Sequence, residues 1–278
     1  MKLKHLPFWL IAPSAIFLIV LFVWPLAETA LMAFRSPEGR WTDAYVIKMW
    51  GDLNFSRAMK NTLLLVVVVV PLQIILAMAM MLQNMNRGRM GFLYVWTIPL
   101  GISDLAAGLA WLAIFTDRGY LNSLLGMFGA SPVSWLSYEN PAMLFLCVVV
   151  AEIWRATSIV LVILVAGVQL IPKEYNEAAE VFGAGPWTRF RRITLPLIKP
   201  SLQTALILRT VMAFKVFAVV YALSGRDFPV LVGEAYNWQG PFQNTHVASA
   251  YALLILLISM ACTLFYLRAL RVRRETLA

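Results

Sequence analysis

The chain contains uninterrupted apolar runs that are too long for a soluble domain of ordinary composition. Between Asn61 and Asn86 no residue carries a charge, and the run includes LLLVVVVVPLQIILAMAMML. A helix needs about 20 predominantly apolar residues to cross the hydrocarbon core of a bilayer. Charged residues make up 13% of the chain and apolar residues 61%, against about 25% and about 45–50% in soluble domains. We therefore expect an integral membrane protein.

Six apolar segments alternate with shorter polar ones, which predicts an all-α fold with six transmembrane helices. In lipid every backbone N–H and C=O must be paired, and a helix does this within one segment. No soluble-looking segment exceeds about 30 residues, so residues 1–278 are interpreted as one membrane domain. The predicted spans are residues 8–34, 61–85, 90–116, 141–169, 197–224 and 247–267.

Prolines mark predicted irregularities in the spans. The first span is longer than the apolar core of about 7–15 residues in a cleaved signal peptide, so we expect it to be retained, with a kink at Pro25. Pro99-Leu100-Gly101 interrupts the third span. Residues 35–60, 117–140 and 225–245 are expected to be loops, the first with a short interfacial helix in its middle.

The net charge of +9 is distributed in short clusters beside the apolar runs. Such clusters are typical of cytoplasmic loops and argue against a nucleic-acid-binding surface. Six spans put both termini on one side, and that side carries thirteen Lys and Arg residues against seven on the other. The bias predicts cytoplasmic termini.

Cys147 and Cys262 each lie inside an apolar run and are expected to pack as small buried side chains. No Cys or His spacing suggests a metal site. No Gly-x4-Gly-Lys-Ser/Thr phosphate loop occurs. The chain is therefore not expected to be an enzyme, to have catalytic residues, or to bind a metal or nucleotide itself.

One polar stretch, residues 171–196, stands between the fourth and fifth apolar runs and reads IPKEYNEAAEVFGAGPWTRFRRITLP. Pro172 suits the first turn of a helix, and Glu174 and Glu177 suit the positive end of its dipole. Gly183 suits the left-handed position that ends a helix. The pattern predicts a helix of about 11 residues, about 16 Å long.

The predicted helix has an acidic stripe and an apolar face at helical spacing, the latter formed by Ile171, Tyr175, Ala178 or Ala179, and Phe182. After it, Gly185-Pro186 turns the chain into a basic segment in which Trp187 and Phe190 face one way. From these residues alone the stretch is either a docking surface for another protein or an amphipathic helix on the lipid headgroups.

The order Glu177-Ala178-Ala179, then Gly183, then Ile193-Thr194-Leu195-Pro196 resembles the EAA motif of the membrane subunits of bacterial ATP-binding-cassette importers. The resemblance implies a type I importer permease fold in the bacterial plasma (inner) membrane. It also implies that the stretch is a coupling helix, which docks into a cleft on the ATPase subunit. The implied docking residues are Glu177, Ala178, Ala179, Val181, Phe182 and Gly183.

Further segments resemble the carbohydrate branch of these importers, which includes maltose, trehalose and glycerol-phosphate systems. They are residues 151–185, the Trp111, Phe115 and Gly119-Tyr120-Leu121-Asn122 positions, and Leu208-Arg209-Thr210 with Phe214 and Phe217. The resemblance covers most of residues 61–278. It implies that the chain forms half of a pathway for a mono-, di- or oligosaccharide.

Two departures bear on the solute. That branch usually has an Asp just after the Phe at 217 and a Gly-Gly-Pro after the fifth span. This chain has Ala218 and Gly225-Arg226-Asp227-Phe228-Pro229. A polyol or a phosphate ester of the glycerol-phosphate type therefore stays open beside a sugar.

The resemblance implies several partners and no nucleic acid. They are a second, similar permease chain in a heterodimer, two ATP-binding-cassette ATPase subunits that carry ATP and Mg²⁺, a soluble binding protein outside, and membrane lipid.

Five charged residues lie inside the predicted spans: Asp104, Glu152, Arg155, Arg209 and Lys215. Each costs at least about 2.5–3.5 kcal/mol if it faces lipid at mid-depth, so each is expected to face protein or water. Glu152 and Arg155 are three residues apart and are expected to pair. Arg209 is expected to extend toward the inner surface.

The candidate solute-path residues are Asp104, Trp111, Trp154, Lys215 and Tyr221. Asp104 follows the break in the third span, and interrupted spans border binding sites in transporters. Lys215 lies nearer mid-depth than Arg209. For Asp104 the alternative is a polar contact at a subunit interface, and for the two tryptophans it is the interfacial aromatic belt.

Two other functions compete with the importer. A proton-driven secondary transporter would use Asp104 and Glu152 as relay acids, but it leaves the EAA pattern unexplained. A membrane scaffold would use the polar stretch only to anchor a soluble partner.

Overall fold

The computed structural model describes residues 6–83 and 89–270, and this part of the chain is helical apart from loops and one isolated β-bridge between Arg35 and Trp41. The all-α prediction is therefore confirmed. The chain forms two compact units, residues 1–56 with 231–257 and residues 57–230 with 258–278. Several residues counted for orientation lie outside the described residues: Lys2, Lys4, Arg87, Arg271, Arg273 and Arg274.

Within the described residues, four helices are long and apolar enough to cross a membrane, and two bent pairs raise the number to six if each pair is one span. The four are Leu10–Met32, Phe55–Met81, Pro141–Gln169 and Thr245–Ala269. The bent pairs are Leu93–Gly101 with Asp104–Met127 and Lys199–Phe214 with Ala218–Ser224.

The N-terminal span consists of α1 (Leu6–Leu18), the π-helical turn η2 (Ile19–Val23) and α2 (Trp24–Met32). Pro25 lies in the first turn of α2, directly after this π-helical turn. A proline has no N–H for the carbonyl four residues earlier, and its ring crowds that carbonyl. The irregularity predicted at Pro25 is thus a wider helical turn just before it.

The first unit also contains α3 (Ala44–Trp50), which is the short helix predicted in the 35–60 loop, and α14 (Leu231–Gln239). The prediction of a loop over residues 225–245 is wrong where α14 lies. The Asp52 carboxylate accepts hydrogen bonds from Trp238 Nε1 at 2.6 Å and from the Tyr251 hydroxyl at 2.9 Å. One acid after α3 therefore holds both α14 and α15 (Thr245–Ala269).

The core of the second unit is formed by α4 (Phe55–Gln83), α8 (Pro141–Gln169) and α12 (Lys199–Phe214). Buried apolar side chains from all three helices form one cluster, which includes Ile74, Leu161 and Ala205. Where α8 and α12 cross, a Cβ added to Gly167 would lie 2.3 Å from Ser201 Oγ. The missing side chain at Gly167 therefore lets the two helices approach closely.

The third predicted span does not run straight. It consists of α5 (Arg89–Thr97), the 3-10 turn η3 (Ile98–Gly101) and α6 (Asp104–Phe115), with a bend of 108°. Ile102 is extended and Ser103 caps a new helix by accepting from the Ala106 N–H. The break predicted at Pro99-Leu100-Gly101 is confirmed, and the two helices on either side of it pass as one broken span.

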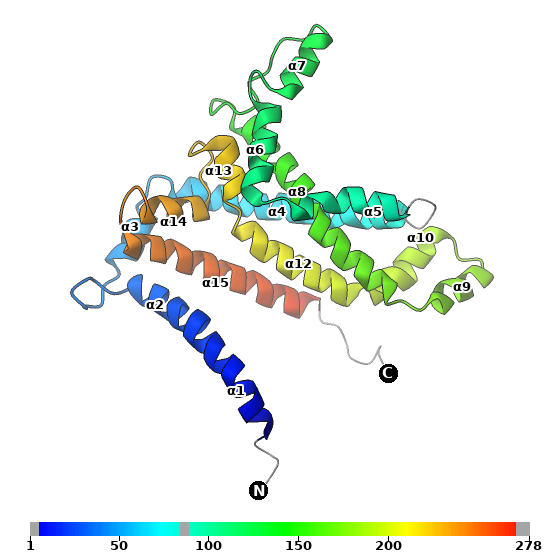
Figure 1. The fold of residues 1–278 in the computed structure, drawn as a ribbon, viewed down its shortest axis with the longest axis horizontal. Helices are drawn as coiled ribbons and strands as arrows, with labels where there is room; N and C mark the ends of the chain where they lie inside the picture. Colours follow the sequence, from blue (N-terminus) through cyan, green and yellow to red (C-terminus); the bar gives the residue numbers. More distant parts are fainter. Residues whose placement is uncertain (1–5, 84–88, 271–278) are drawn as a thin grey trace. The chain divides into compact units, whose positions relative to one another are not determined.

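The fifth predicted span is also divided, because α12 ends at Phe214 and α13 (Ala218–Ser224) follows at an angle of 44°. Helix α13 packs against α6, as Figure 1 shows. Their contact depends on Gly108, where an added Cβ would lie 2.7 Å from the Ala222 Cβ. Helices α6 and α13, each of which starts just after one of the two breaks, thus pack against each other.

The predicted loop over 117–140 contains α7 (Tyr120–Met127), so that prediction is wrong there. Asn122 is buried and holds this region together. Its amide donates to the carbonyls of Asp117 and Val133 and accepts from the Val133 N–H and Trp135 Nε1, at 2.8–3.0 Å. The Asn of the Gly119–Asn122 sequence therefore has a structural role.

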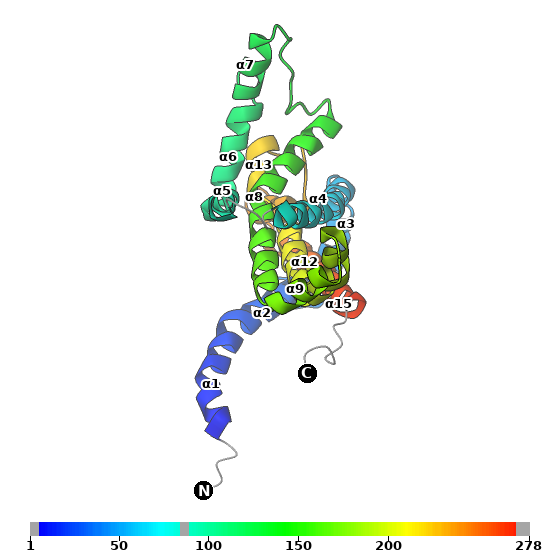
Figure 2. The ribbon, with the colours of Figure 1, turned by 90° about the vertical axis from the view of Figure 1, so that its right-hand side faces the viewer.

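The polar stretch forms α9 (Lys173–Val181), α10 (Pro186–Arg189), the π-helical turn η4 (Phe190–Thr194) and α11 (Leu195–Leu197). Figures 1 and 2 show α9 and α10 at the end of the second unit that lies away from α13.

Candidate functional site

The helix predicted in the polar stretch is present as α9, nine residues long rather than about 11. Gly183 has φ +73°, the left-handed conformation that favours glycine. Its N–H donates to the Glu180 carbonyl and the Ala184 N–H to the Ala179 carbonyl, each at 2.9 Å. These two bonds form a Schellman cap, so the left-handed, helix-ending position predicted for Gly183 is confirmed.

The residues implied as the docking surface are Glu177, Ala178, Ala179, Val181, Phe182 and Gly183. No residue of α9 is buried. Val181 is 86% exposed and Phe182 89% exposed. Two apolar side chains side by side in water at the end of a polar helix are a feature of interaction surfaces.

The segment after α9 returns to the core of the second unit. Trp187 and Phe190 stack with ring centroids 5.6 Å apart, as predicted, and Phe190 is buried in the cluster that contains Leu161 and Ala205. Arg189 forms an ion pair with Glu180 of α9.

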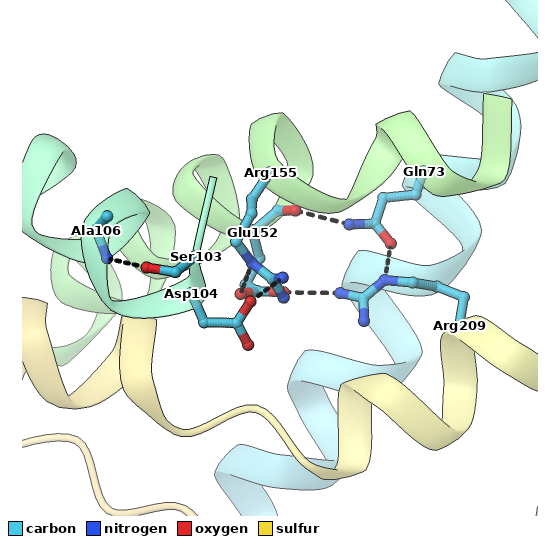
Figure 3. Close-up of polar contacts among 7 residues, drawn as sticks. All are labelled: Gln73, Ser103, Asp104, Ala106, Glu152, Arg155 and Arg209. Atoms are coloured by element: carbon cyan, nitrogen blue, oxygen red, sulfur yellow. Dashed lines mark hydrogen bonds and ion pairs between the residues drawn. The ribbon is translucent and has the colours of Figure 1, made fainter. Parts of the chain in front are cut away.

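Four charged residues of the predicted spans and one amide form a polar network, buried except at Asp104 and shown in Figure 3. Arg155 donates to both carboxylate oxygens of Glu152 at 3.1 Å and to Asp104 at 2.6 Å. Arg209 donates to Glu152 Oε2 at 2.7 Å and to Gln73 Oε1 at 2.5 Å. Gln73 in turn donates to the Glu152 carbonyl at 2.8 Å. The network joins α4, α6, α8 and α12.

The network has two acids and two arginines, so its formal charges cancel. Glu152 and Arg209 are each 1% exposed, whereas the Asp104 side chain is 55% exposed. Buried charges are tolerated when paired and hydrogen-bonded, and Glu152 pairs with both arginines, although Arg209 Nη1 has no hydrogen-bond partner within the described residues. The predicted pair of Glu152 and Arg155 is therefore confirmed as part of a larger network.

The network corrects one prediction and adds one residue. Arg209 does not extend toward the surface but is buried against Glu152 and Gln73. Gln73 was not singled out from the sequence, although an amide in the run VVVVVPLQIILAM is the available signal, because a buried polar side chain requires a partner.

The structure brings together some of the candidate solute-path residues. Trp111 and Trp154 meet edge to face with centroids 5.9 Å apart, and both pack against a second buried cluster, which includes Phe115 and Val219. Asp104 lies in the first turn of α6 and is paired with Arg155.

Lys215 and Tyr221 lie at and after the second break. Lys215 is exposed between α12 and α13, and the Tyr221 ring is 5.2 Å from that of Phe217. Within the described residues no hydrogen bond or ion pair joins Lys215 to Asp104. In this part of the chain the exposed charges of Lys215 and Asp104 are thus not paired with each other.

Comparison with known proteins places residues 74–274 in the family "Binding-protein-dependent transport system inner membrane component". The chain is 33% identical to the trehalose/maltose transport system permease protein MalF of Thermococcus litoralis over 208 residues, which are 72% of this chain and 68% of that protein. It is 30% identical to the sulfoquinovosyl glycerol transport system permease protein SmoG of Agrobacterium fabrum, over 95% of this chain and 90% of that protein.

A similar fold occurs in the crystal structure of a bacterial transporter involved in the import of the acidic polysaccharide alginate. The TM-score is 0.82 at 22% identity, and the match covers 96% of this chain and 95% of that one. The likeness confirms the type I importer permease fold. The chain is a membrane component rather than an enzyme, and it belongs to the binding-protein-dependent transport system inner membrane component family.

Proposed function

We propose that this chain is one of two similar permease subunits of an ATP-driven importer and forms half of the path for a sugar. Two relatives with 30% or more identity are named for transport of trehalose/maltose and of sulfoquinovosyl glycerol, and sugar is the chemistry they share. The observation that carries the proposal is the exposed Val181-Phe182 pair on the capped helix α9.

In this proposal two ATPase subunits dock from the cytoplasm, the docking surface of this chain binds in a cleft on one of them, and ATP and Mg²⁺ are held by those subunits. A soluble binding protein delivers the solute on the other side. Both chain termini are cytoplasmic. Closure of the ATPase pair moves α9, and the second unit changes between outward- and inward-facing arrangements. The partner permease is a different but similar chain.

Docking is tested with Phe182→Glu. A charge in place of an exposed aromatic ring removes apolar contact area, so the variant should insert normally while the ATPase no longer co-purifies. Phe128→Glu is the matched control, since Phe128 is 82% exposed and lies just beyond α7. Normal ATPase co-purification and transport by the Phe182 variant contradict the docking assignment.

The solute is tested with the purified cognate binding protein in a thermal-shift screen of sugars, polyols and their phosphates. A shift with sugars alone supports the proposal, and a shift with glycerol phosphate alone replaces sugar by a phosphate ester. Uptake that is driven by ATP and survives an uncoupler separates the importer from a proton-driven carrier.

A further inference from the structure

Helix α9 has few connections to the rest of the second unit. None of its residues is buried. Among the described residues, Glu180 is the α9 side chain that has an ion pair, and its partner is Arg189. Within the described residues, this ion pair links a side chain of α9 to the segment that follows it. A force applied to α9 by a partner can therefore pass through this pair as well as through the chain.

Of the acids of α9 and the arginines after it, Glu180 and Arg189 are the ones that pair in the described part of the chain. The helix offers three acids, Glu174, Glu177 and Glu180, and the segment after it offers Arg189, Arg191 and Arg192. Arg191 and Arg192 are exposed, whereas the Arg189 side chain is only 20% exposed and lies on Glu180. The Schellman cap at Gly183 folds the chain back so that these two residues meet.

The route continues from Arg189 into the core. The next residue, Phe190, is buried at 6% exposure and packs with side chains of α4, α8 and α12. Trp187, one helical turn before, stacks on the Phe190 ring. The short helix α10 thus carries an ion pair to α9 at its last residue and is followed at once by an aromatic anchor in the core.

We infer that Glu180 and Arg189 are positioning residues that transmit movement of the docking surface to the α4, α8 and α12 core. The inference rests on the proposed function. An exposed ion pair adds little to stability. Its contribution is to fix the direction of α9 relative to Phe190, so that a push on α9 turns the core instead of bending the loop. Coupling along such a route requires a direct energetic test.

The test is a charge-exchange cycle in the complete reconstituted complex with its binding protein. Glu180→Arg and Arg189→Glu are made singly and together, and ATP-driven uptake, ATP hydrolysis and ATPase co-purification are measured. Mutations along a coupling route change the coupling by about 0.5–2 kcal/mol, which corresponds to about 2–30-fold, so each single variant should lose about that factor in solute moved per ATP hydrolysed. ATPase co-purification should persist, and the double variant should recover most of the loss.

Glu174→Arg and Arg192→Glu are the matched controls, because these exposed residues have no ion pair within the described chain. Their double variant should show no recovery beyond the singles. Unchanged coupling in both Glu180 and Arg189 single variants overturns the inference.

Loss without recovery in the exchanged double variant also overturns it, and points to direct contact of Glu180 with the ATPase. A failure of the proposed function gives a different result. In that case the ATPase still co-purifies with the Phe182→Glu variant.

Discussion

At the residue scale, Glu152 is the centre of the polar network. Its two carboxylate oxygens accept from both buried arginines, and its backbone carbonyl accepts from Gln73. Asp104 is peripheral by comparison, because its side chain is 55% exposed and, within the described residues, its ion pair is with Arg155. The two acids should therefore differ in their effect on stability.

Glu152→Gln removes the charge that compensates two buried guanidinium groups, and breaking a buried pair costs about 3–5 kcal/mol. Asp104→Asn removes a partly exposed partner and should cost about 1 kcal/mol or less. Thermal unfolding of the purified protein in detergent, followed by tryptophan fluorescence, measures both. Equal losses of stability in the two variants contradict the central role of Glu152.

The sequence predicts part of this network. Glu152 and Arg155 are three residues apart on one helix, so their pairing follows from helix geometry alone. The bonds from Arg209 to Gln73 and to Glu152 join residues 136 and 57 positions apart. Those contacts depend on which faces of α4, α8 and α12 meet, and helical periodicity does not specify this.

At the element scale, the long apolar helices and the capped helix α9 follow from apolar runs and from Pro172 and Gly183. The bend of 108° in the third span does not. Pro99 predicts a break, but its angle is determined by the extended Ile102 and by the new helix that Ser103 caps. Helices α7 and α14 have only eight and nine residues, and so few turns give a weak periodic signal.

The α8–α12 crossing depends on Gly167. Gly167→Ala puts a Cβ 2.6 Å from the Ser201 Cβ, and overpacking of this kind typically costs about 1–3 kcal/mol. Gly126→Ala, where nothing lies within 4 Å, is the control and should be neutral or stabilising by up to about 1 kcal/mol. Unfolding temperatures that do not separate the two variants contradict this account of the crossing.

At the scale of the whole molecule, the second unit contains the docking surface, the polar network and both broken spans. The orientation is a proposal from the sequence. It places the segment directly before α8 outside the cell membrane and the polar stretch directly after α8 inside. Tyr138 and Trp187 are 68% and 66% exposed on either side of that helix.

Cysteine labelling in intact cells checks the orientation. An impermeant maleimide should modify Tyr138→Cys directly and Trp187→Cys only after permeabilisation. The parent chain is the control, because Cys147 is buried and Cys262 is partly buried. Direct labelling at 187 with protection at 138 means that the termini are outside.

Because the formal charges of the polar network cancel, a voltage across the membrane exerts no net force on the network as a whole. Moving one elementary charge through the membrane potential is worth about 2.3 kcal/mol per 100 mV. Asp104, Glu152, Arg155 and Arg209 displaced together transfer no net charge, so voltage does no work on that displacement. A movement of the four residues as one rigid group would therefore be electrically silent, and the membrane voltage would neither assist nor oppose it.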